Sequence, residues 1–260
     1  MEYACQNCNR NIIENFCSNC GQKKFKRIDR KYIGDELQYT LVHTNKGFLY
    51  SVKNILKNPG KTAREFIDGN RVNHYKPLGL VFILSGISAF ISFKIIGLQK
   101  IMDSVNTSMN QNTVVMQELM NVIQHYNALI MLLFIPVLAL LSKISFNDWK
   151  QNYYEHTVMN AFGMAYYVSL TILIVYPIMF ICRDNLDLSF KVSAYAMVTV
   201  PFMMLYFYKN FYPEQTKKAI LIRVFLKTIL FAFAYIGIII IATMELFIKY
   251  GVSGLKPPIH

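Results

Sequence analysis

Five long apolar stretches constrain the fold of this chain more than any other feature of its sequence. They run from Pro77 to Leu98, about His125 to Leu141, His156 to Ile181, Val192 to Phe211 and Ala219 to Ile248. Each approaches or exceeds the roughly 20 residues that a helix needs to cross a bilayer, and the second is the shortest. We therefore predict an all-α integral membrane protein with about five transmembrane helices, which form a bundle over residues 77–260.

The charge of the chain predicts its orientation. Lys and Arg number 27 against 15 Asp and Glu, although 54% of the 260 residues are hydrophobic. Residues 1–76 hold 14 of these cations and 7 acids, so more than half of the net charge of +12 precedes the first span. Because cytoplasmic segments carry an excess of Lys and Arg, we predict a cytoplasmic N-terminus and, after five spans, a C-terminus outside. The first residues lack an apolar run, and we expect no cleavable signal peptide.

Two CxxC pairs stand near the start of the sequence. Cys5 and Cys8 are followed, after eight residues, by Cys17 and Cys20. Because thiols on the cytoplasmic side stay reduced, this spacing favours a metal site over disulfides. Two such pairs can bring four thiolates to one tetrahedral Zn²⁺, and four sulfur ligands leave no open coordination position. We therefore predict a structural zinc ribbon over residues 1–22, with free surface thiols as the alternative.

A basic cytosolic or juxtamembrane segment over residues 23–76 follows the cysteines, after Gly21, which permits a tight turn. Its first part, Lys23–Lys31, holds six cations in nine residues. Basic arms bind nucleic acid in other proteins. So close to a membrane, however, lipid phosphates or solvent are the simpler partners. We therefore expect membrane lipids, and not nucleic acid, as the partner of this run.

Two short amphipathic helices are predicted within the basic segment. Asp29 can cap a helix that runs to about His43. A second helix over residues 46–57 lies either at the membrane interface or against other cytosolic helices, and the sequence favours neither position. Its apolar stripe consists of Phe48, Val52, Ile55 and Leu56.

The junction before the first span is rich in polar and turn-forming residues. Residues 58–77 have the sequence NPGKTAREFIDGNRVNHYKP, and the helical part ends where Gly69 offers a left-handed cap. Arg71 and His74 then precede Pro77, at the depth of the lipid head groups. We weigh two interpretations. Either these residues anchor the chain at the interface, or they face a site between the spans.

A second polar stretch, NDWKQNYYEHTVMNAFG, leads into the third span. Its Glu155 and His156 could bind a metal or move a proton, but adjacent positions on a helix point about 100° apart. On the same helix, His156, Asn160 and Gly163 share a face and favour a packing seam with interhelical hydrogen bonds. In the predicted topology both polar stretches lie at the cytoplasmic face of the membrane, where they could meet.

The rest of the sequence gives few signs of transport. The segment from Gln99 to Gln124 is rich in Asn, Gln, Ser, Thr and Met, and we predict a loop that ends in an amphipathic turn. The charges of the fifth span, Lys227 among them, are expected near its ends. Charges in the middle of a span mark ion pathways, so charges near the ends give little support to a channel or pump. An odd number of spans without a visible repeat is also not typical of transporters.

Three of these motifs together resemble a known family. The CxxC…CxxCGQ pattern, the PGKTAREFIDGNRVNHYKP junction and the NYYEH stretch resemble a bacterial multi-pass membrane family, the domain-of-unknown-function family 3667. The resemblance covers most of the chain and implies zinc binding by the four cysteines and a place in the bacterial inner membrane, but no catalytic role. The motif positions are Pro59, Gly60, Gly69, Arg71, Tyr75, Pro77, Tyr153, Glu155 and His156.

The sequence leaves three functions open. The first is a non-enzymatic binding, scaffold or sensing role, in which the zinc ribbon docks a cytosolic protein and the bundle anchors it. The second is a lipid-directed membrane enzyme, since two histidines, a carboxylate and an arginine suit proton transfer beside a phosphate. The third, which the sequence supports least, is a transporter. The candidate catalytic residues of the enzyme are Arg71, His74, Glu155 and His156, none of which is assigned a role.

Overall fold

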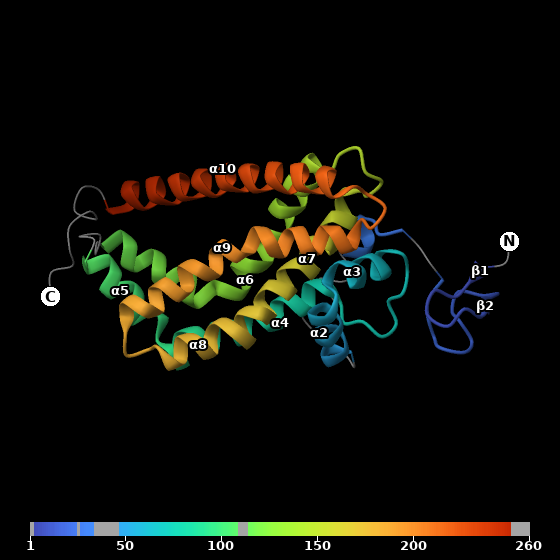
Figure 1. The fold of residues 1–260 in the computed structure, drawn as a ribbon, viewed down its shortest axis with the longest axis horizontal. Coiled ribbons are helices and arrows are strands. Elements are labelled where there is room, and N and C mark those ends of the chain that lie inside the picture. The colour runs from blue at the N-terminus through green and yellow to red at the C-terminus, as the bar shows by residue number, and fades with distance from the viewer. Residues whose placement is uncertain (1–2, 25–26, 34–46, 109–113, 251–260) are drawn as a thin grey trace.

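The computed structural model describes residues 3–24, 27–33, 47–108 and 114–250. In these residues the chain is a bundle of long helices with a small β-ribbon at its N-terminal end (Figure 1). Five helices are long and apolar enough to cross a membrane, which confirms the predicted all-α membrane fold. They cover Pro77–Ile96, Gln117–Ser145, Tyr153–Ile181, Leu186–Phe211 and Lys217–Glu245.

Each span consists of one long helix or of consecutive helical segments. The first span is α4 (Pro77–Phe90) with the π-helical segment η1 (Ile91–Ile96), and the second is α6 (Val114–Ser145). The third joins α7 (Tyr153–Leu170), the π-helical η2 (Thr171–Val175) and α8 (Tyr176–Ile181), and the last two are α9 (Leu186–Phe211) and α10 (Lys217–Tyr250).

Local sequence explains where these helices begin. Pro77 opens α4 at a position where a helix does not need the missing N–H. At the start of α7, Asn152 and Glu155 form a capping box, in which each side chain accepts a hydrogen bond from the backbone N–H of the other residue. Asn185 caps α9 in a similar way by accepting a hydrogen bond from the N–H of Leu188.

The elements outside the spans lie at the two ends of the bundle (Figure 1). One end carries α2 (Phe48–Lys57), α3 (Pro59–Ile67) and, beyond them, the ribbon. The ribbon strands β1 (Tyr3–Ala4) and β2 (Asn11–Ile12) pair antiparallel. The other end carries α5 (Leu98–Ser108).

The predicted juxtamembrane helices agree with the structure where it describes them. In α2, Ile55 is fully buried, and Phe48 and Val52 pack against the main core, so this helix is part of the bundle. Asp29 accepts a hydrogen bond of 2.8 Å from the backbone N–H of Tyr32 and caps the start of the first helix. The rest of that predicted helix, from residue 34 to 43, lies outside the described residues.

A glycine lets α3 lie directly on α9. A Cβ added to Gly60 would stand 2.1 Å from the carbonyl oxygen of Phe207, so only glycine fits this crossing. Six residues further along, Phe66 packs edge-on against Phe162 of α7, with 5.3 Å between ring centroids. The junction helix is therefore a buried part of the main core and not only a connection to the first span.

The predicted loop from Gln99 to Gln124 is wrong in its described part. Residues 98–108 form α5, and α6 already begins at Val114. Ile101 is buried beside Ile96 and Met179, and Leu98 packs against the same cluster. A few apolar side chains at helical spacing thus hold a segment whose overall composition is polar.

Candidate functional site

The four N-terminal cysteines lie in two knuckles of the same geometry. The N–H of Cys5 donates to the carbonyl of Arg10, and the N–H of Cys17 donates to the carbonyl of Gln22, at 2.8 and 2.7 Å. Each knuckle turns at the residue after its second cysteine, where φ is positive: Asn9 has 60° and Gly21 has 71°. Asparagine tolerates this conformation better than most residues, so Asn9 takes the place that glycine holds in the second knuckle.

This cluster fits a tetrahedral metal ion. The sulfur atoms of Cys5, Cys8, Cys17 and Cys20 all lie within 4.8 Å of one another. A Zn²⁺ ion with four sulfur ligands at about 2.3 Å requires sulfur–sulfur distances of about 3.8 Å. The Cys5–Cys20 and Cys8–Cys17 sulfur pairs are each 3.5 Å apart. The cluster can therefore hold a metal ion without rearrangement of the backbone.

The ribbon contacts the junction through Gln22, the residue after the second knuckle. Its side-chain oxygen accepts hydrogen bonds from the backbone N–H groups of Arg71 and Val72, at 3.1 and 2.9 Å. The side chain is 4% exposed. A second contact joins Asn73 to Asn7 of the first knuckle at 3.2 Å. Both knuckles thus touch the loop between α3 and α4.

The basic run makes a further contact that its sequence does not reveal. The guanidinium of Arg27 donates to both carboxylate oxygens of Glu155, at 2.8 and 2.9 Å, and to the carbonyl of Lys150. Next to it, Ile28 is buried in the main core, and its carbonyl accepts a hydrogen bond from Asn152. At least this part of the basic run is attached to the start of α7.

In the junction, Arg71 and His74 lie on either side of Phe66. The Arg71 guanidinium donates to the Phe66 carbonyl at 3.0 Å and lies 4.9 Å from the ring centroid of Tyr32. The His74 ring is 8% exposed and packs edge-on against Phe66 and two other aromatic rings. Burial lowers the pKa of His74 to about 4, so this imidazole is neutral at physiological pH.

In the second polar stretch, Glu155 and His156 have different surroundings. Glu155 accepts hydrogen bonds from Arg27 and from the backbone N–H of Asn152, which completes the cap of α7. His156 is fully buried, and neither ring nitrogen has a hydrogen-bond partner. The two polar stretches do meet, because Phe162 of α7 contacts both Phe66 and His74. The contacts that hold Arg71, His74, Glu155 and His156 in place are mostly with residues outside this set of four candidates.

A buried polar cluster within the spans was not expected from the sequence. Lys227 of α10 is 4% exposed, and its ammonium donates to the side-chain oxygen of Asn160 at 2.7 Å and to the hydroxyl of Tyr208 at 2.6 Å. Asn160 in turn donates to Ser142 of α6 at 2.7 Å. The predicted seam on α7 is therefore confirmed at Asn160, whose hydrogen-bond partners on other helices come from α6 and α10. A search for single cations inside apolar spans would have flagged Lys227.

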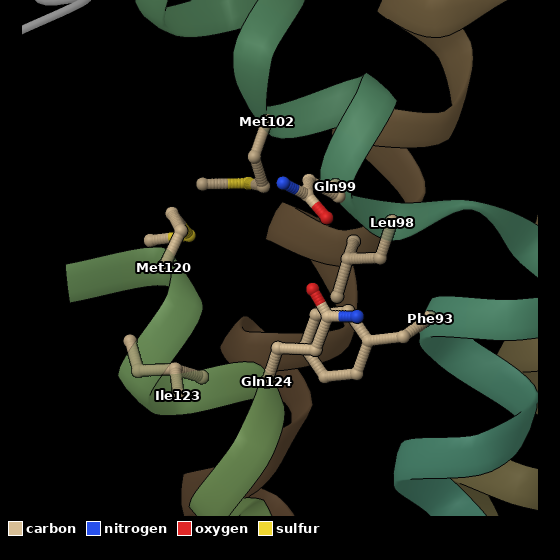
Figure 2. A pocket seen from close by; sticks show the side chains of 7 residues that line it. All are labelled: Phe93, Leu98, Gln99, Met102, Met120, Ile123 and Gln124. Carbon is tan, nitrogen blue, oxygen red and sulfur yellow. The ribbon is translucent and has the colours of Figure 1, made fainter. Parts of the chain in front are cut away.

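A cavity of about 160 Å³ lies at the opposite end from the ribbon, between η1, α5 and the start of α6 (Figure 2). Its wall is almost entirely apolar, and two methionines and two glutamines contribute to it. None of the candidate catalytic residues lines it. The lining residues are Phe93, Leu98, Gln99, Met102, Met120, Ile123 and Gln124.

Comparison with known proteins identifies one family and no function. Residues 45–89, which include α2, α3 and most of α4, match the family model described as "Protein of unknown function (DUF3667)". This match confirms the predicted resemblance. No curated protein and no solved structure shows significant similarity to the chain.

Proposed function

We propose that this multi-pass membrane protein is a non-enzymatic sensing and docking protein of the bacterial inner membrane. Its N-terminus lies in the cytoplasm and its C-terminus outside. Cys5, Cys8, Cys17 and Cys20 hold a structural Zn²⁺, which fixes the two knuckles of the ribbon. The ribbon binds a cytosolic protein partner on its outer side and the membrane bundle on its inner side.

The observation that carries this proposal is the bond between Gln22 and the junction. Gln22 follows the last cysteine by two residues, so the knuckle that holds the metal also sets the position of its side chain. That side chain binds two backbone N–H groups of the loop that leads into the first span. A change in the metal or in a bound partner therefore acts on the membrane bundle through these two hydrogen bonds.

The outer side of the ribbon offers apolar groups to a partner. The loop between the knuckles exposes Ile13, which is 93% exposed, and Phe16, which is 58% exposed. Ribbons of this size have little core of their own and use bound metal for stability. Their exposed apolar side chains are therefore free for binding rather than for folding.

The surroundings of the four candidate residues favour this function over a lipid-directed enzyme. Glu155 is bonded to Arg27 and caps a helix, while His74 and His156 are buried. A general base must reach a proton of its substrate at about 2.6–3.2 Å. Glu155 and His74, which are engaged or enclosed in this way, stabilise the meeting of the two polar stretches instead.

Photo-crosslinking in cells tests the proposal. A photoreactive residue in place of Phe16 should capture one discrete cytosolic protein, identified by mass spectrometry. The same residue in place of Leu49, which is 80% exposed on α2, is the matched control and should not capture that protein. Capture should also disappear with Cys17→Ser. The proposal fails if Phe16 captures nothing above the control, or if capture is unchanged by Cys17→Ser.

A further inference from the structure

Lys227 is a buried basic side chain that has no acid beside it in the described residues. Of the three N–H groups of its ammonium, two donate to the neutral oxygens of Asn160 and Tyr208. In the described part of the chain, no carboxylate forms an ion pair with it. It lies ten residues into α10, about 15 Å along the helix from Lys217. A charge at that depth is costly unless something pairs with it.

Arg223, the neighbouring cation on α10, is paired with an acid, as buried or half-buried cations usually are. Arg223, one turn before Lys227, donates to Asp148 at 2.7 Å and to the carbonyl of Ser145 at 2.9 Å. It also lies 4.7 Å from the ring centroid of Trp149. The chain thus supplies an acid to the arginine at the edge of the span and not to the lysine deeper in it.

His156 adds a second unsatisfied group at the same place. It stands one turn before Asn160 on α7, and Asn160 donates to its carbonyl at 2.7 Å. The side chain of Asn160 therefore links His156 and Lys227, because it also accepts a hydrogen bond from Lys227. Buried polar atoms in folded proteins nearly always have a hydrogen-bond partner, yet both ring nitrogens of His156 have none. Glu155, the nearest acid in sequence, is bonded to Arg27 and Asn152.

We propose that Lys227 and His156 are the recognition groups of an oxyanion site inside the bundle, and that the ligand is a phosphate group. A phosphate has several acceptor oxygens, which suits two basic groups on different helices, and it supplies the negative charge that Lys227 lacks. The phosphate belongs either to a lipid head group or to a free anion. This site is separate from the ribbon and does not depend on the function proposed for it.

Ligand-induced stabilisation of the full-length protein distinguishes these sources. The protein is purified in an uncharged maltoside detergent, which contains no phosphate. Thermal unfolding is then followed with added inorganic phosphate in one arm and added phosphatidic acid in the other. A ligand at 100 times its dissociation constant stabilises the folded state enough to raise Tm measurably. We expect Tm of the wild type to rise in one arm, and that arm identifies the source.

Four variants show whether the ligand binds at Lys227. Lys227→Met, of similar length but uncharged, should weaken binding by tenfold or more, and Lys227→Arg should retain it. Lys61→Met, which removes an exposed cation of α3, should bind as the wild type does. If Lys227→Met does not fold, His156→Gln tests the same site and should weaken binding. The proposal is overturned if neither ligand raises Tm, or if Lys227→Met and Lys61→Met lose the same affinity.

Discussion

Two polar regions of this molecule treat their charges in opposite ways. At the ribbon end, Glu155 is paired with Arg27, and Arg64 of α3 is paired with Glu214. Inside the bundle, Lys227 and His156 are buried more deeply than these pairs, but no acid forms an ion pair with either of them in the described residues. A satisfied charge pair is sufficient to hold two segments together. A buried basic group without a counter-ion favours a further partner, so the first region indicates structure and the second indicates binding.

Removal of the metal should have the largest effect on the ribbon end. Apparent binding free energies of structural zinc are about 10–16 kcal/mol in small zinc-finger peptides. Cys17→Ser should therefore abolish stoichiometric zinc, measured by elemental analysis of the purified protein. Cys182→Ser, outside the cluster, is the control and should retain one zinc per chain. Full zinc content in both variants would show that the four cysteines do not hold a metal.

Acid should destabilise the ribbon end through His74. Its pKa is about 4 in the folded protein against an ordinary 6.5, so the unfolded chain binds the proton first. The stability that His74 provides is thus complete above pH 6.5 and is lost as pH falls towards 4. The loss amounts to at most about 3 kcal/mol. Denaturant unfolding of wild type and His74→Phe at several pH values should show a flatter profile for the variant; parallel profiles would contradict this account.

The crossing of α3 and α9 should depend on Gly60. A methyl group there would overlap the Phe207 carbonyl, and overpacking of this kind costs about 1–3 kcal/mol. Gly60→Ala should lower Tm, whereas Gly86→Ala should not, because nothing lies within 4 Å of a Cβ at Gly86. Equal melting temperatures for the two variants would mean that the helices do not cross as described.

The smallest effect on stability is expected from the loss of the charge pair between Arg27 and Glu155. Glu155→Gln keeps the shape of the side chain but weakens the bonds to Arg27 and to the cap of α7, at a cost of about 1–2 kcal/mol. Asp187→Asn, in an exposed pair with Lys191, should leave the unfolding curve unchanged. If Glu155→Gln is equally silent, the ribbon end is not held by this pair, and the contrast with Lys227 loses its basis.

Sequence alone was sufficient where local pattern decides structure. The CxxC spacing, the five apolar runs, the turn at Gly69 and the seam residue Asn160 all follow from neighbours within a few residues. Contacts between distant segments could not be predicted, such as Arg27 with Glu155, which are 128 residues apart. The burial of Lys227 depends on which face of α10 meets α6 and α9. For α5, the polar composition led to the prediction of a loop. The structure has a helix there, because Leu98 and Ile101 pack against apolar neighbours.

Amide hydrogen exchange at Arg71 and Val72 tests most directly whether the ribbon is docked to the bundle. The side-chain oxygen of Gln22 accepts a hydrogen bond from each of these N–H groups. We predict that chelation of the metal accelerates exchange in the peptide that carries them, and that Gln22→Ala does so with the metal still bound. A peptide from the middle of α7 should not change. Unaltered exchange at Arg71 and Val72 in both experiments would contradict the coupling of the metal site to the membrane bundle.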